Sequence, residues 1–255
     1  DLFAFKQDHI FKDWDDVKAN ANNRYDAIGE LYGPAAWEAL KDKAGKQPIE
    51  PGDVCWADLN NDGVINNLDR VKVGNLFPTV TGGFSTTLGY KDFSLYARFD
   101  YALGHTLYND LAARSLGQYQ GSFNIIDMVK DSWSETNQDT DIPKFYYADQ
   151  LSKKNITRSN NGLTAVDNNS SRFYEKGDYL ALREITLTWN LPKKWINKAL
   201  MSNASVYVTG QNLFYITGYT GVSPEPAVDT TYGQGLDNGR YPTPKTVLLG
   251  LSVTF

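Results

Sequence analysis

The sequence predicts an all-β protein, namely an antiparallel transmembrane β-barrel to which this chain supplies roughly the last six strands. Three observations lead to this prediction. Segments in which apolar and polar residues alternate recur along the second half of the chain. Long polar stretches separate these segments, as the extracellular loops of such barrels do. Moreover, the chain contains no apolar run of about 18 residues, which excludes a membrane-spanning helix but leaves a barrel possible.

The clearest predicted strand is the segment 247–255. Every second residue from Val247 to Phe255 is large and apolar, so these side chains share one face of a strand. The opposite face carries only small or hydroxyl side chains, apart from Leu248. An apolar face against lipid and a small polar face against a lumen fit a barrel wall. A strand of a soluble β-sandwich can alternate in the same way, so this segment alone only suggests a barrel. It becomes informative because the same pattern recurs upstream.

The same alternation recurs in four further segments, which are 84–90, 93–103, 185–191 and 204–214. The first two are separated only by Lys91 and Asp92, which predicts a tight hairpin turn. We expect a sixth strand in the aromatic run Leu2–Phe5. Because even small membrane barrels need about eight strands, most of such a barrel would lie outside this chain.

The pattern divides the chain into two parts. Residues 1–82 are predicted to hold one barrel strand and an extracellular loop, and residues 83–255 the remaining transmembrane strands and their loops. Two long polar stretches, 104–177 and 220–242, are expected to be extracellular. Short helices are predicted inside the loops, at 13–17, 34–40, 122–129 and 195–200.

The composition excludes several classes of function. The net charge of −5 argues against a nucleic-acid partner. Cys55 is the only cysteine, so the chain has neither a disulfide framework nor a cysteine metal cluster, and we interpret Cys55 as a small, semi-buried hydrophobe. The two histidines, His9 and His105, have no nucleophile motif near them, and His105 is placed at a strand end. We therefore expect no enzymatic activity.

One motif predicts a specific ligand. The segment 58–69, DLNNDGVINNLD, matches a calcium-binding loop of the EF-hand type, with glycine at its sixth position for the sharp turn. The predicted calcium ligands are Asp58, Asn60, Asp62, Val64, Asn66 and Asp69, where Val64 acts through its carbonyl and Asn66 through water. The last ligand is aspartate instead of the usual glutamate, and the alternative is a polar turn that binds no ion. A bound Ca²⁺ would stabilise an exposed loop and would not be a catalytic centre.

These features together resemble the carboxy-terminal part of the SusC/RagA-like TonB-dependent outer-membrane transporters. The block from Pro51 to Arg70 is similar to the family pattern PGD…DLNGDGVI…DR, and 74–78, GNLFP, is similar to GNPFP. The segment 177–187, GDYLALREITL, is similar to GSYLRLKNVTL. The strand Gln211–Phe214 and the ending Leu249–Phe255 complete a resemblance that covers about residues 50–255.

The resemblance implies a plugged barrel of about 22 strands in the bacterial outer membrane. It implies that the remaining amino-terminal part of the same transporter, with its plug and TonB box, accompanies this chain and couples it to TonB. It also implies a SusD-like surface lipoprotein as a lid and the import of oligosaccharides or peptides. The substrate-binding residues stay unassigned; candidates for the lumen and loops are Arg98, Asp100, Glu184, Tyr119, Phe145, Tyr146 and Tyr147.

Two other readings compete with the barrel. A soluble, secreted, calcium-binding β-sandwich that binds carbohydrate would explain the aromatic residues and the calcium loop. It would not explain the alternation of charged and apolar residues that closes on Phe255. A secreted glycoside hydrolase fragment would need a pair of catalytic carboxylates, and no such pair is identifiable from the sequence.

Overall fold

The computed structural model describes residues 1–21, 24–26, 31–32, 50–62, 64–65, 67–118, 126–145, 170–225, 235–237, 239 and 241–255. The chain forms two compact units. Unit 1 comprises Asp1–Asn75, Tyr108–Glu175 and Leu236–Asn238, and unit 2 comprises Leu76–Leu107, Lys176–Gly235 and Gly239–Phe255. The predicted loop 104–177 therefore contributes most of its length to unit 1 and does not only connect strands.

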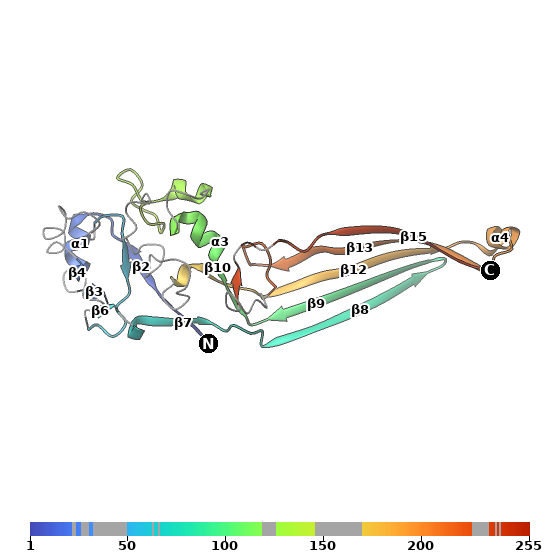
Figure 1. Cartoon of the computed structure of the whole chain (residues 1–255), viewed down its shortest axis with the longest axis horizontal. Helices are drawn as coiled ribbons and strands as arrows, with labels where there is room; N and C mark the ends of the chain where they lie inside the picture. The colour runs from blue at the N-terminus through green and yellow to red at the C-terminus, as the bar shows by residue number, and fades with distance from the viewer. Residues whose placement is uncertain are drawn as a thin grey trace. The chain divides into compact units, whose positions relative to one another are not determined.

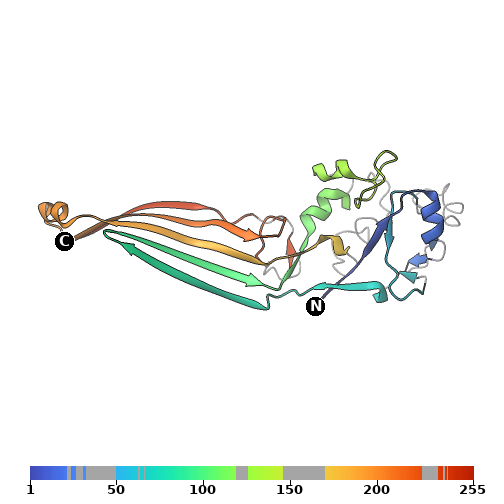
Figure 2. The same ribbon diagram turned by 180° about the vertical axis from the view of Figure 1, so that it is seen from behind.

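Unit 2 is built on a five-stranded antiparallel sheet (Figure 1). Its strands are β8 (Val80–Tyr90), β9 (Phe93–Leu103), β12 (Tyr179–Asn190), β13 (Asn203–Thr217) and β15 (Thr246–Thr254). The spatial order, β8-β9-β12-β13-β15, is also the order along the chain, and Figure 2 shows the same neighbours from behind. This arrangement is an up-and-down meander, and it confirms all five strands predicted from alternation.

The two faces of this sheet differ as the alternation predicts. One row across four strands is entirely apolar, and it joins Leu95, Leu187, Val208 and Leu249. The next row holds Ser94, Thr188, Tyr207 and Gly250 on the opposite face. Large apolar side chains of the first face are exposed, including Leu249 with 81% of its surface. In the described part of unit 2, no second layer of strands covers this face.

Short connections join the strands at one end of the sheet. Lys91 adopts a positive φ of 53° in the turn between β8 and β9, which matches the predicted hairpin. Between β12 and β13 lie α4 (Lys193–Ile196) and the 3₁₀ helix η7 (Asn197–Ala199), which confirms the predicted helical turn.

Outside the large sheet, the described residues form small sheets and short helices. The strand pairs are β1 (Leu2–Phe5) with β7 (Arg70–Gly74) and β2 (Gln7–Ile10) with β5 (Val54–Trp56). Two three-stranded sheets consist of β3 (Arg24–Asp26), β4 (Leu31–Tyr32) and β6 (Val64–Ile65), and of β10 (Thr106–Asn109), β11 (Tyr174–Lys176) and β14 (Leu236–Asp237). The helices are α1 (Trp14–Ala21), η1 (Asn67–Asp69), α3 (Asp110–Ala113), the π-helical η2 (Arg114–Gln118), η3 (Asp127–Asp131) and η6 (Ser171–Phe173).

The buried apolar clusters of the described residues all lie in unit 1. The largest groups Phe5, Ile10, Val54, Trp56, Ile65 and Trp133. Strands of unit 1 thus bury their apolar faces against one another, whereas the sheet of unit 2 leaves one apolar face exposed. The two units therefore suit different surroundings, because unit 1 has a core of its own and the sheet of unit 2 needs another apolar medium or partner.

The structure corrects one expectation and limits two others. The run Leu2–Phe5 forms a strand, but it pairs with β7 instead of joining the large sheet, so that sheet has five strands in the described chain. The helix predicted at 34–40 lies outside the described residues. Of the helix predicted at 122–129, only the end is described, and it is the 3₁₀ helix η3.

None of the helices in the described part of the chain has the length and apolar character needed to span a bilayer.

Candidate functional site

A β-bulge in β12 places a charged side chain where plain alternation would not. Leu182 pairs with Phe99 and Glu184 with Arg98, so Arg183 is left between two ladder positions. A bulge of this kind turns an extra side chain toward one face of a sheet. Arg183 consequently lies on the polar face beside Asp100, one residue before Glu184 on the same face.

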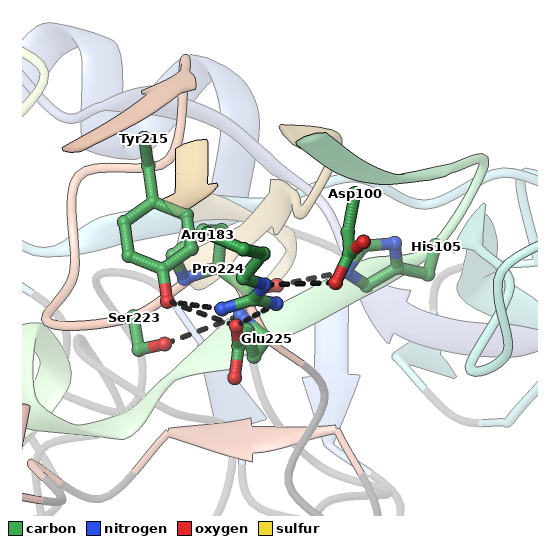
Figure 3. Close-up of polar contacts among 7 residues, drawn as sticks. All are labelled: Asp100, His105, Arg183, Tyr215, Ser223, Pro224 and Glu225. Carbon is green, nitrogen blue, oxygen red and sulfur yellow. Dashed lines mark hydrogen bonds and ion pairs between the residues drawn. The ribbon is translucent and has the colours of Figure 1, made fainter. Parts of the chain in front are cut away.

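Arg183 is the centre of a polar network drawn in Figure 3. Its Nε donates to Asp100 Oδ2 at 2.9 Å, its Nη1 donates to the Tyr215 hydroxyl at 3.3 Å, and its Nη2 lies 2.5 Å from Glu225 Oε1. The Tyr215 hydroxyl in turn donates to Glu225 Oε1 at 2.8 Å. Two carboxylates therefore share one guanidinium, whose side chain is only 17% exposed.

His105 fixes the same loop at a second point. Its Nε2 donates to the Pro224 carbonyl at 2.9 Å, and the imidazole is buried. The His105 carbonyl accepts the Gly177 amide at 2.9 Å, and a Cβ at Gly177 would lie 2.2 Å from His105 Nε2. Figure 3 shows the Pro224 carbonyl bonded to His105 and the Glu225 carboxylate bonded to Arg183. Segment 223–225 is thereby tied to the end of β9 and to the bulge of β12.

The network holds the segment 223–225 in place, because its polar groups bond to one another. Arg183 contacts three partners, and the Ser223 hydroxyl accepts the Glu225 amide at 3.3 Å. Such charge-assisted bonds hold a loop in a single geometry. The chemistry of the cluster is ion pairing, and it contains no arrangement of nucleophile and base.

The predicted lumen and loop candidates have different outcomes. Asp100 belongs to the network, and Arg98 and Glu184 are direct cross-strand neighbours on the polar face. Phe145 is half-buried in unit 1, and Tyr119, Tyr146 and Tyr147 lie outside the described residues. Sequence reasoning missed Arg183, Tyr215 and Glu225. The succession of Arg183 and Glu184 within an alternating strand is the signal that could have revealed the bulge.

The predicted calcium loop is drawn together by its own polar groups. The Leu59 amide donates to Asp69 Oδ1 at 2.9 Å, which joins the start of the loop to its twelfth position. The Asp62 amide donates to Asn60 Oδ1 at 3.1 Å, and Asp69 is fully buried. Val64 lies in β6, while Gly63 and Asn66 are outside the described residues. Asp58, Asn60, Asp62 and Asp69 all carry side-chain oxygens in this loop, but Asp58, Asp62 and Asp69 do not bring three carboxylates within 4.8 Å of one another.

Asp110 is expected to make the stability of unit 1 depend on pH. Burial raises the pKa of this carboxyl above its ordinary value of 3.8, against the opposing effect of Arg114. The folded state therefore binds the proton more tightly than the unfolded chain does. This contribution to stability is present at low pH and is lost as the pH rises through the raised pKa. Between about pH 4 and pH 7, the Tm of the wild type should fall more steeply with rising pH than the Tm of Asp110→Asn. Equal slopes of Tm against pH in the two proteins would contradict a raised pKa at Asp110.

Comparisons with known proteins relate this chain to TonB-dependent receptors. No family model matches the chain. TonB-dependent receptor P3 of Formosa agariphila is 31% identical over 243 residues, which are 90% of this chain and 22% of that protein. TonB-dependent receptor P26 of the same organism is 32% identical, covering 82% of this chain and 20% of the relative. TonB-dependent receptor SusC of Bacteroides thetaiotaomicron is 25% identical, covering 86% and 19%.

Solved structures agree with this relationship at the level of the fold. The structure of the RagAB peptide transporter matches 80% of this chain and 21% of its own chain, with a TM-score of 0.61 and 23% identity. The chain spans about a fifth of the length of the curated relatives that it matches. These relatives are named as receptors, not as enzymes. The chain is thus homologous to a segment of the TonB-dependent receptors, SusC among them.

Proposed function

We propose that this chain is the carboxy-terminal barrel segment of a TonB-dependent transporter in the bacterial outer membrane. The observation that carries the proposal is the five-stranded meander, with one exposed apolar face and one polar face. Lipid would cover the apolar face, and the polar face with the Arg183 network would line the lumen. The soluble β-sandwich would need a second sheet over the apolar face, and the described residues of unit 2 supply none.

The edges of the sheet indicate the first partner. Strands β8 and β15 each have one neighbour in the sheet, and a free edge in hydrocarbon leaves backbone groups without hydrogen bonds. The remaining amino-terminal part of the same transporter would supply the pairing strands, the plug and the contact with TonB. This proposal agrees with the chain spanning about a fifth of its relatives.

The second proposed partner is a SusD-like surface lipoprotein that covers the extracellular side. The transported substrate would be an oligosaccharide or a peptide. The SusC relative supports a transporter of this type, and RagAB, which shares the fold, is described as a peptide transporter. Affinity purification of the intact transporter from detergent-extracted membranes tests the partner directly. A stoichiometric lipoprotein and the remaining transporter strands are expected, and a chain that purifies alone and stays in buffer without detergent would contradict the proposal.

We also propose that the loop 58–69 binds one structural Ca²⁺ through Asp58, Asn60, Asp62, Asp69, the Val64 carbonyl and a water held by Asn66. The donors are all oxygen, which Ca²⁺ prefers. Asp69 is buried and already fixes the Leu59 amide, so its carboxylate is oriented before any ion binds. The ion would stabilise unit 1 and take no part in transport chemistry.

Removal of calcium should loosen this loop. When the intact transporter is treated with a calcium chelator, hydrogen exchange is expected to accelerate in 58–69, and added Ca²⁺ should reverse the change. Asp62→Asn should weaken Ca²⁺ binding with little other effect, because Asp62 is exposed. Asp139→Asn, at another exposed aspartate of unit 1, serves as the matched control. Exchange that is the same with and without calcium would contradict the site.

A further inference from the structure

A second β-bulge gathers three metal-ligating side chains in unit 1. In the pairing of β2 with β5, Gln7 faces Trp56 and His9 faces Cys55, so Asp8 is the extra residue of a bulge. Consecutive residues of a regular strand point to opposite faces, but a bulge re-aims one of them. As a result, one ligand atom each from Asp8, His9 and Cys55 lies within 4.8 Å of the others.

The histidine lies between two carboxylates. His9 Nδ1 is 2.9 Å from Asp8 Oδ2, and His9 Nε2 is 3.2 Å from Asp16 Oδ1. Asp16 belongs to α1, and its other oxygen, Oδ2, accepts the Lys12 amide at 2.9 Å. The Asp16 carboxylate is therefore held in place and can accept a hydrogen bond from the Nε2–H group. With a proton on Nε2, the lone pair of Nδ1 points toward Asp8 Oδ2, and either a proton or a metal cation can then lie between these two atoms.

Cys55 is the third candidate ligand, and it lies on the interior side of the group. Cys55 is buried beside Phe11 and Val17, while the side chains of His9 and Asp8 are 33% and 54% exposed. A cation could therefore enter from the solvent-exposed side, where Asp8 and His9 lie, and bind the thiolate of the buried Cys55. Sulfur, imidazole nitrogen and carboxylate oxygen are together the donor set of a zinc site, and Ca²⁺ would not select it.

We propose that Asp8, His9 and Cys55 bind a Zn²⁺ ion, with a fourth position open to water. The Cys55 thiol gives up its proton to solvent when the metal binds, and the thiolate, the His9 Nδ1 lone pair and one Asp8 oxygen become ligands. Asp16 acts as a positioning residue that accepts a hydrogen bond from the His9 Nε2–H group, an arrangement that orients zinc-bound histidines. The ion joins β2 to β5 and so stabilises unit 1. The proposal does not depend on the transport function.

Cobalt spectroscopy on the intact, detergent-purified transporter tests this site. Co²⁺ bound at Cys55 is expected to give a thiolate-to-metal charge-transfer band that added Zn²⁺ removes. The calcium loop cannot produce this band, because its ligands are oxygen atoms. Cys55→Ala should abolish the band, and Asp16→Asn should keep it while weakening the apparent affinity about 10–100-fold. Asp15→Asn is the matched control, since Asp15 is exposed and pairs with Lys18, and it should leave the affinity unchanged.

Two results would overturn the proposal. One is the absence of any charge-transfer band in the wild type under excess Co²⁺, a measurement that does not depend on how a variant folds. The other is a bound-zinc content that is equal in the wild type and in both Cys55→Ala and His9→Gln. His9 would then bridge Asp8 and Asp16 through hydrogen bonds without a metal.

Discussion

Replacing Arg183 with methionine is expected to detach the segment 223–225 from the sheet and to cost about 1–3 kcal/mol of local stability. The substitution keeps an unbranched side chain but removes the cation that Asp100 and Glu225 share. The two carboxylates would then face each other without a counter-charge. They are 43% and 33% exposed, so water moderates the loss below the figure for a fully buried pair.

Hydrogen exchange of residues 218–225 in the intact transporter measures the effect. Arg98→Met is the matched control, because Arg98 lies on the same polar face and has no ion pair among the described residues. Glu225→Gln should have a smaller effect, since the amide oxygen can still accept from Arg183 and Tyr215. If Arg183→Met and Arg98→Met change the exchange of this segment equally, the network does not hold the loop.

Gly52→Ala is expected to destabilise unit 1 by about 2–5 kcal/mol. Gly52 has a φ of +94°, a conformation that residues with a Cβ rarely adopt. A Cβ there would also lie 2.6 Å from Trp133 Cε3 and 2.7 Å from Lys144 Cβ. The backbone has little freedom to move away, because the Gly52 amide donates to the Phe11 carbonyl and its own carbonyl accepts the Lys144 amide, both at 2.8 Å.

The matched control is Gly218→Ala, where an added Cβ meets nothing within 4 Å and the φ is not positive. Thermal unfolding and limited proteolysis of the intact transporter should show a loss for Gly52→Ala and almost none for Gly218→Ala. The loss should appear as faster cleavage within unit 1, because Gly52 is bonded to Phe11 and Lys144 and lies close to Trp133. Equal behaviour of the two variants would show that the tight packing at Gly52 has no energetic consequence.

Alternation was sufficient to predict the large sheet. Its strands have one apolar face throughout, so the period of two is uninterrupted in 93–103 and 247–255. In these strands the apolar face expected from the sequence is the exposed apolar face in the structure. The same reasoning found the strand at Leu2–Phe5 but gave it the wrong partner. A strand of four residues carries too little pattern to identify its neighbour, and its pairing with β7 depends on the fold of unit 1.

The Arg183 network could not be predicted because its members come together only in three dimensions. His105 and Pro224 are 119 residues apart in the sequence, and Arg183 and Asp100 are 83 apart. A bulge shifts the phase of the alternation at a single residue, and one such shift changes which side chains share a face. The proposed calcium loop could be suggested from the sequence for the opposite reason, because its candidate ligands follow one another within 58–69.

The central claim is that lipid covers one face of the five-stranded sheet, and paired cysteine labelling tests it most directly. In a Cys55→Ala background, Leu249→Cys and Ser252→Cys place one thiol on each face of β15. In the transporter reconstituted in vesicles, a fluorophore at 249 should be quenched by lipids labelled in their acyl chains, and the one at 252 should not. Equal quenching at both positions, or none at 249, would contradict the barrel.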